Sequence, residues 1–124
     1  EPIIDIPNEP YIVNLDMNAC QRIIDNLLTN ARRYTTGNVK IQLCKRDCYY
    51  SLSVSNQAKN LSQQDVLHIF ERFYQQDKSR QCKGNGLGLY IVKLLADKMG
   101  LIINSTLENG WLCITLLFHI GPLC

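Results

Sequence analysis

The stretch DMNACQRIIDNLLTNARRYTTGNVKIQLCKRDCYYSLSV, residues 16–54, contains the two periodicities that decide the fold. In its first half, apolar residues recur every three or four positions, which is the pattern of one long amphipathic helix. Asp16 stands where an N-cap residue belongs, and Gly37 is a natural helix terminator. In its second half, apolar and polar residues alternate over 39–43 and over 50–54, with a polar turn between the two runs. The stretch therefore predicts a helix followed by a β-hairpin.

The rest of the chain adds further helices and a second hairpin. Ser62 and Asp65 have the spacing of a capping box, which predicts a short helix that reaches residue 70. Four apolar residues indicate a second long helix that stops at Gly100: Leu87, Ile91, Leu94 and Leu95. Strands at 102–107 and 111–118 flank an Asn-Gly turn, and residues 11–15 form a short β-prone run. These elements favour the α+β class, as a two-layer α/β sandwich with helices on one face of a mixed, mostly antiparallel sheet.

Length and composition narrow the classes of function. The chain has 124 residues, 46% of them hydrophobic, which fits one compact domain spanning residues 1–124. Its formal net charge of +2 lacks the basic excess of a nucleic-acid-binding surface. We find neither a secretory signal nor an apolar run that could span a bilayer. Because the sequence starts without Met, we expect it to be a fragment of a longer protein.

Six cysteines raise the question of a disulfide framework. No two of them form a CxxC pair, which argues against a zinc site. Cys20, Cys44 and Cys113 lie in apolar-patterned segments, where free cysteine behaves as a small hydrophobe. We therefore expect a reduced, cytosolic chain.

On the first long helix, Asn26, Asn30 and Arg33 are spaced so that their side chains share one stripe. Asn is a mediocre helix former, so two of them within a helix call for an explanation. An Asn carbonyl is a hard oxygen ligand that suits Mg²⁺, and a nearby Arg can neutralise phosphate oxygens. The stripe is consistent with a triphosphate site, and equally with ordinary polar surface.

The segment 84–89, with Gly84, Gly86 and Gly88 before a predicted helix, suggests backbone amides that approach a phosphate. It is not the dinucleotide-binding pattern, because Leu89 stands where the last glycine belongs, and it lacks the Gly-Lys-Ser/Thr of a P-loop. Alone, such a turn is more often a simple loop. Aromatic residues at 69–74 are by default part of a core, and the basic residues that follow them suit a solvated loop or a lid.

In this order and spacing, segments 26–35, 69–74 and 84–93 closely resemble the N box, F box and G2 box of sensor histidine kinases. The resemblance covers the chain from about residue 11 to residue 118, and we expect a kinase of Gram-positive type. It implies the fold shared with gyrase, Hsp90-type chaperones and mismatch-repair ATPases, the Bergerat or GHKL fold. It also implies a site for ATP and Mg²⁺ beneath a flexible lid.

The resemblance assigns roles to individual residues. Asn30 corresponds to the Mg²⁺-coordinating Asn of the family, and Asn26 to its partner beside the metal and the phosphates. Arg33 takes the place of a phosphate-binding Lys, and Tyr34 that of an aromatic residue packed on the adenine. Arg80 resembles a lid residue that reaches the γ-phosphate, so Asn30, Arg33 and Arg80 are the expected catalytic residues. The other residues that the resemblance places around ATP are Asn56, Ala58, Asn60, Leu61, Phe70, Arg72, Phe73, Lys83, Gly84, Asn85, Gly86, Leu87 and Gly88.

One box departs from the family pattern. Relatives carry Asp-x-Gly-x-Gly after the second hairpin strand, where the Asp accepts a hydrogen bond from the adenine amino group. Here Asn56 takes the Asp position, while Ala58 and Asn60 replace the two glycines. An Asn carbonyl still accepts from adenine, at an expected loss of about 1 kcal/mol relative to a charged acceptor, and Asn60 tolerates unusual backbone dihedrals.

The resemblance also implies partners. Neither His68 nor His119 has the sequence context of a phosphoacceptor, so the acceptor histidine is expected on the dimerisation domain of the intact protein. The next acceptor is then the receiver Asp of a response regulator. We expect the intact protein to be a membrane-anchored homodimer and the isolated cytoplasmic domain to be a monomer. The alternatives are another ATPase or an anti-sigma type serine kinase of the same fold, or an interaction module that has lost nucleotide binding.

Overall fold

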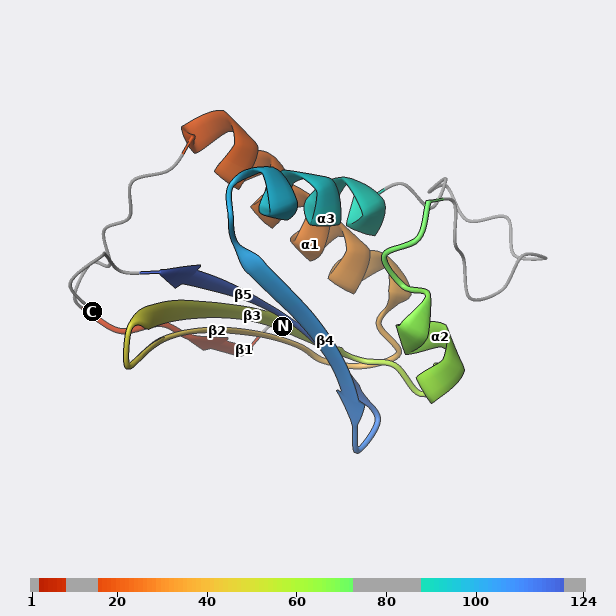
Figure 1. The fold of residues 1–124 in the computed structure, drawn as a ribbon. Helices are drawn as coiled ribbons and strands as arrows, with labels where there is room; N and C mark the ends of the chain where they lie inside the picture. Colours follow the sequence, from red (N-terminus) through yellow and green to blue (C-terminus); the bar gives the residue numbers. More distant parts are fainter. Residues whose placement is uncertain (1–2, 9–15, 73–87, 120–124) are drawn as a thin grey trace.

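The computed structural model describes residues 3–8, 16–72 and 88–119. Two long helices lie across one face of a five-stranded sheet, and a short helix stands at one end of the molecule (Figure 1). The elements in chain order are β1 (Ile3–Asp5), α1 (Met17–Tyr34), β2 (Val39–Arg46), β3 (Tyr49–Gln57), α2 (Gln63–Leu67), α3 (Gly88–Lys98), β4 (Ile102–Glu108) and β5 (Trp111–His119). The expected α+β sandwich is confirmed. The β-prone run at 11–15 lies outside the described residues.

The ends of α1 have clear local causes. The Asp16 carboxylate accepts from the backbone N–H groups of Asn18 at 3.0 Å and Ala19 at 3.2 Å, as an N-cap residue does. The helix stops because Thr35 adopts an extended backbone, with φ −67° and ψ 140°. Gly37 does not adopt the left-handed conformation, so the interpretation of Gly37 as the helix terminator is wrong. A different reason for this glycine is given below.

The sheet has the order β1-β2-β3-β5-β4. Strand β1 pairs with β2 in parallel, and every other pair is antiparallel, so the expectation of a mixed, mostly antiparallel sheet is confirmed. Asn109 and Gly110 have φ values of 52° and 78°, which is the geometry of a tight type I′ turn between β4 and β5. The sequence did not predict β1, which is only three residues long and whose residues are all exposed.

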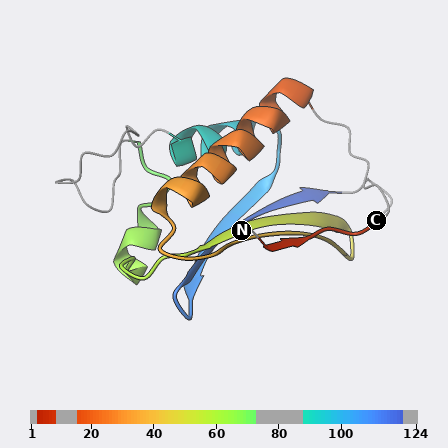
Figure 2. The same ribbon diagram turned by 180° about the vertical axis from the view of Figure 1, so that it is seen from behind.

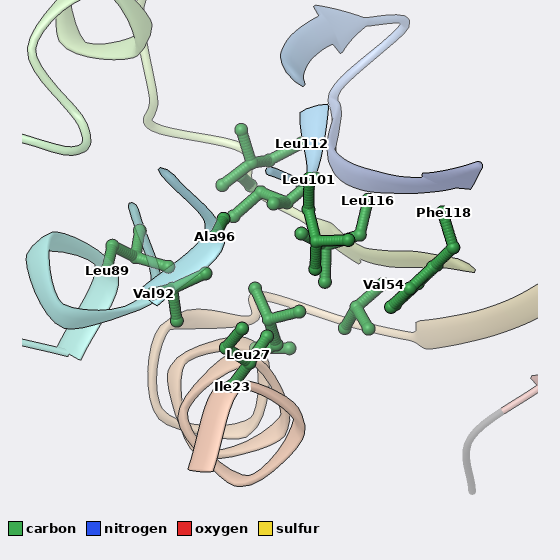
Figure 3. Packing of buried hydrophobic residues seen from close by; sticks show 13 residues of the cluster. Ile23, Leu27, Val54, Leu89, Val92, Ala96, Leu101, Leu112, Leu116 and Phe118 are labelled. Carbon is green, nitrogen blue, oxygen red and sulfur yellow. The ribbon is translucent and has the colours of Figure 1, made fainter. Parts of the chain in front are cut away.

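The core lies between the helices and the sheet (Figure 3). Its most deeply buried large side chains are Ile23 and Leu27 of α1, Val92 of α3 and Leu116 of β5. The buried residues of α3 are Leu89, Val92 and Ala96. The expected helix before Gly100 is confirmed, although the apolar residues that indicated it are not its buried ones: Leu94 is 41% exposed, Ile91 and Leu95 are half-buried, and Leu87 lies outside the described residues.

Short helix α2 begins with the expected capping box, in which Ser62 and Asp65 satisfy each other's backbone N–H groups. It ends at Leu67, and residues 68–70 continue as a turn, so the helix is shorter than expected. Within the described ranges, no helix is long and apolar enough to cross a membrane.

The cysteines differ from the expectation at one position. Cys20, Cys44 and Cys113 are free, and burial raises the pKa of the Cys20 thiol, which favours its protonated form. Cys48 is disulfide-bonded, so the expectation of a fully reduced chain is wrong here. The residue lies in the turn that joins β2 and β3, outside the apolar pattern that keeps the three free cysteines within the fold.

Candidate functional site

Helix α1 has a buried apolar stripe with a polar flank beside it. The central stripe of Ile23, Leu27 and Ala31 is buried against the core. Asn26 and Asn30 each precede one of these buried residues, so they lie about 100° around the helix, at the border between core and solvent. Both asparagines are half-buried. Their position on the flank of the core stripe agrees with the spacing argued from sequence.

The amides of Asn26 and Asn30 make no hydrogen bond among the described residues. No buried side-chain polar atom there lacks a hydrogen-bond partner, so both amides remain accessible to solvent. Half-buried amide oxygens without an internal partner can serve as ligands for a hard cation such as Mg²⁺. The described residues contain no cluster of three or more His, Cys, Asp or Glu that could hold a metal ion. A metal at this surface would therefore be held by amide and ligand oxygens.

The last turn of α1 carries the next two expected residues. Arg33 is exposed and belongs to the basic last turn, where a cation also suits the negative end of the helix dipole. Tyr34 is half-buried and is the last residue of the helix. Along this flank of α1, the amides of Asn26 and Asn30 are followed by the Arg33 guanidinium and then by the Tyr34 ring. These groups suit, in the same order, a metal ion, a phosphate and an aromatic base.

Asn56 lies near the end of β3 and is only 2% exposed. Val54, two residues earlier, is a core residue, so strand alternation puts the Asn56 side chain on the helix-covered face of the sheet. Its Nδ2 donates a long bond of 3.4 Å to the Gln57 carbonyl, and its Oδ1 has no partner among the described residues. Because no buried oxygen there is left unsatisfied, this Oδ1 still reaches solvent. An almost buried amide thus offers one free acceptor, as recognition of an adenine amino group requires.

The segment after β3 does not need the two glycines of the family pattern. Ala58 is 8% exposed, and its N–H donates to the Gly110 carbonyl at 2.8 Å. Asn60 is exposed and does not have a positive φ, so the substitution of Gly by Asn causes no backbone strain in this structure. Leu61 is half-buried against the core. The altered box keeps an ordinary, well-anchored backbone.

Two residues of the F box are described. Phe70 is half-buried against the core cluster, as expected for an aromatic residue after a short helix. The Arg72 guanidinium carbon lies 5.9 Å from the centroid of the Tyr90 ring, a cation–π contact between the F box and α3. Phe73 lies outside the described residues.

Gly88 opens helix α3. A Cβ atom added at this glycine would meet no atom of the described residues within 4 Å. A helix N-terminus fits an anionic group. The remaining residues of this part of the expected site lie outside the described ranges: Arg80, Lys83, Gly84, Asn85, Gly86 and Leu87.

These segments converge at one end of the molecule. The C-terminal end of α1, helix α2 and the first turn of α3 lie together there in both views (Figures 1 and 2). An open groove of about 440 Å³ lies elsewhere, on the opposite flank of α1, where Leu28, Arg32 and Thr35 face the β2 residues Val39 and Ile41. That groove contains none of the expected nucleotide residues. The candidate site is therefore located by the positions of the amides and not by this groove.

The comparisons with known proteins agree with this fold. Residues 15–121 match the family of histidine kinase-, DNA gyrase B-, and HSP90-like ATPases. The match covers well over half of the chain, which therefore belongs to this family of ATP-binding domains.

Particular relatives narrow the family further. The chain is 39% identical over 102 residues to an aerobic respiration control sensor protein ArcB homolog of Haemophilus influenzae, covering 80% of this chain and 31% of the relative. It is 36% identical over 105 residues to the sensor histidine kinase YcbM of Bacillus subtilis, covering 82% of this chain and 34% of the relative. The chain therefore spans about a third of the length of these relatives.

Solved structures show the same fold. The mycobacterial sensor histidine kinase MprB superposes with a TM-score of 0.80 at 25% identity, over 98% of this chain and 83% of that one. Full-length ShkA in complex with AMPPNP superposes with a TM-score of 0.79 at 25% identity, over 98% of this chain and 26% of that one. By family and by structure, the chain corresponds to a histidine kinase catalytic domain.

Proposed function

We propose that this domain binds ATP together with Mg²⁺ and donates the γ-phosphoryl group to a histidine on the dimerisation domain of a sensor histidine kinase. The observation that supports this proposal best is the set of three uncommitted amides. Asn26 and Asn30 line the flank of α1, and the Asn56 oxygen faces the same layer from β3. Because these amide oxygens reach solvent and accept no hydrogen bond among the described residues, they are available to bind a ligand.

The phosphate end of the site is formed by α1 and by the start of α3. Asn30 and Asn26 would hold the metal through their amide oxygens, and Arg33 would neutralise charge on the phosphate oxygens. Bound Mg²⁺ supplies charge neutralisation at the phosphates. Phosphoryl transfer depends mainly on such positioning and charge stabilisation, which these side chains provide. Arg80 is proposed to complete the site from the lid.

The base end of the site is formed by Asn56 and Tyr34. The Asn56 oxygen accepts from the adenine amino group, while the half-buried Tyr34 ring packs against the base. Support comes from the ShkA structure, whose ligand AMPPNP carries both an adenine and a triphosphate-like chain.

The phosphoacceptor is proposed to lie outside this domain. The His68 ring is paired with the Glu71 carboxylate at 2.5 Å, three residues along the chain. His119 ends β5 and makes an edge-to-face contact with Tyr49, with ring centroids 5.2 Å apart. Each histidine therefore contacts a neighbouring side chain of the domain, and we propose that neither is the acceptor.

We further propose that the phosphate passes from the acceptor histidine to the receiver Asp of a response regulator. In this proposal the intact protein is a homodimer anchored in the plasma membrane, and the present chain is its cytoplasmic domain. Relatives more than twice as long that are named as sensor proteins support this arrangement.

Incubation with γ-labelled ATP and Mg²⁺ tests the assignment of the acceptor. The isolated domain is expected to acquire no acid-labile phosphate, whereas a mixture with the dimerisation domain of the intact protein is expected to label that domain. Labelling of His68 or His119 in the isolated domain would contradict the proposal.

Release of free phosphate in the same reaction distinguishes a hydrolytic ATPase of this fold. Such ATPases use a general-base Glu on the helix that corresponds to α1, where this chain has an exposed Asp25 and no Glu. We therefore expect hydrolysis without a partner to stay at the background rate.

A further inference from the structure

The turn between α1 and β2 is fastened to the end of β3 by a set of hydrogen bonds, which we call the β3 clamp and define as Thr35, Thr36, Asn38 and Gln57. The Gln57 carbonyl accepts from the Thr36 N–H at 2.8 Å, from the Thr36 hydroxyl at 3.0 Å and from the Thr35 hydroxyl at 3.4 Å. The Gln57 N–H donates to the Asn38 carbonyl at 3.0 Å. Segments about twenty residues apart are thereby held together.

The Gln57 side chain adds a bond that its backbone cannot make. Its Oε1 accepts from the Asn38 N–H at 2.6 Å, so Gln57 engages both backbone groups of Asn38. Gly37 makes this possible, because a Cβ atom at position 37 would collide with Gln57 Oε1. Since Gly37 has no positive φ, close approach by Gln57 is the reason for a glycine here.

The clamp joins the two residues that form the base end of the site. Tyr34 ends α1 directly before the clamped turn, and Asn56 directly precedes Gln57. The Thr36 hydroxyl also accepts from the Lys59 N–H at 3.1 Å, which extends the attachment beyond the strand. Any loosening of the clamp therefore changes the distance between the Tyr34 and Asn56 backbones.

Gln57 itself does not face the nucleotide layer. It alternates with Asn56 along β3, so its side chain is directed away from the face that Asn56 shares with the helices. Its influence on a ligand must pass through the residues that it fixes.

We propose that Gln57 is a positioning residue for adenine recognition, because it holds the end of α1 that carries Tyr34 in register with Asn56. This inference rests on the proposed binding of ATP. It assigns a function to the variable position of the adenine box, which sequence patterns leave undefined.

Three variants test the clamp. Gln57→Leu removes the acceptor at similar volume, Gln57→Glu keeps an acceptor oxygen, and Gly37→Ala displaces the Gln57 side chain without changing it. The matched control is Gln42→Leu, since Gln42 lies on the same face of the sheet as Gln57 but bonds the Asp5 carboxylate at 3.1 Å, outside the clamp. Circular dichroism establishes that each variant is folded, and Gly37→Ala carries the test if Gln57→Leu does not fold.

Affinities are measured by displacement of a fluorescent ATP analogue with ATP, GTP and Mg²⁺-tripolyphosphate. Gln57→Leu and Gly37→Ala are expected to weaken ATP binding about fivefold, the effect of losing one hydrogen bond, and to leave tripolyphosphate within about twofold of wild type. The preference for ATP over GTP falls by the same factor. Gln57→Glu and Gln42→Leu are expected to match wild type.

Unchanged ATP affinity in Gln57→Leu and Gly37→Ala would overturn the proposal, as would an equal loss of ATP and tripolyphosphate affinity, which indicates a merely structural role. Failure of the proposed function has a different signature, because the wild-type domain would then not bind ATP at all.

Discussion

At the scale of single residues, the proposed site depends on amide oxygens of Asn26, Asn30 and Asn56 that accept no hydrogen bond among the described residues. Asn26 and Asn30 occupy a helix, where asparagine is unfavourable, yet they do not use their side chains to cap or bend it. Asn56 is almost fully buried with an uncommitted oxygen. Three such residues in one layer are explained by a ligand that binds them.

The metal assignment predicts the effect of Asn30→Ala. Because the substitution removes one hard oxygen ligand, it is expected to lower the ATP affinity measured with Mg²⁺ by about tenfold. The ATP affinity measured without Mg²⁺ is expected to change little. The matched control is Asn18→Ala, an exposed asparagine in the first turn of the same helix. Titration with and without Mg²⁺ measures both; an unchanged Mg²⁺ effect would show that Asn30 is not a ligand.

The base assignment predicts the effect of Asn56→Asp. A charged acceptor for the adenine amino group is expected to tighten ATP binding by about 1 kcal/mol, or about fivefold, with no gain for GTP. Asn56→Leu is expected to reduce the preference for ATP over GTP. The ratio of the two affinities is the measurement, and equal gains for both nucleotides would contradict base recognition by this residue.

At the scale of elements, the sequence predicted what local chemistry controls. The Asp16 cap, the Ser62 capping box and the Asn-Gly turn are confirmed, because each is made by residues within a few positions of one another. Prediction from the sequence failed where contacts between distant segments determine the structure. The strand Ile3–Asp5 exists only as a partner of β2, and Gln57 acts on a turn about twenty residues earlier in the chain.

The buried stripe of α3 is a further example. The sequence around Leu94 and Leu95 does not indicate which side of the helix faces the core. Contact with α1 and the sheet buries Leu89, Val92 and Ala96 instead. For the site, the helix stripe and Asn56 were predictable from motifs. The Arg72 contact with Tyr90 was not, since it joins two boxes across the fold.

Core packing predicts different costs for two leucine truncations. Leu27 is 1% exposed and Leu94 is 41% exposed. Leu27→Ala is expected to lower the free energy of unfolding by about 2–5 kcal/mol, because it leaves a cavity between α1 and the sheet. Leu94→Ala is expected to cost less than about 1 kcal/mol. Urea denaturation measures both free energies of unfolding. Similar midpoints for the two variants would contradict the burial of Leu27 and the exposure of Leu94.

At the scale of the whole molecule, the proposed function places ATP binding in this domain and the phosphate acceptor in another. One side of each long helix packs into a continuous core. The C-terminal end of α1 and the first turn of α3 lie at one end of the domain (Figures 1 and 2). A domain built in this way can orient a nucleotide toward a second domain. The match to about a third of the length of its relatives agrees with such a division.

Binding of ATP to the folded state alone predicts thermal stabilisation of the domain. At a nucleotide concentration of about one hundred times the dissociation constant, ATP is expected to raise the free energy of unfolding by about 2.7 kcal/mol. The full increase is expected only when Mg²⁺ is present. Differential scanning fluorimetry measures it, with Asn30→Ala as the control for the metal. A melting temperature that ATP leaves unchanged would favour an interaction module without nucleotide binding.

The most direct test of the central claim is a titration of the wild-type domain with a fluorescent ATP analogue, with and without Mg²⁺. We predict saturable binding that tightens when Mg²⁺ is present and that ATP displaces in preference to GTP. The absence of saturable binding at nucleotide concentrations of about 1 mM would contradict the account.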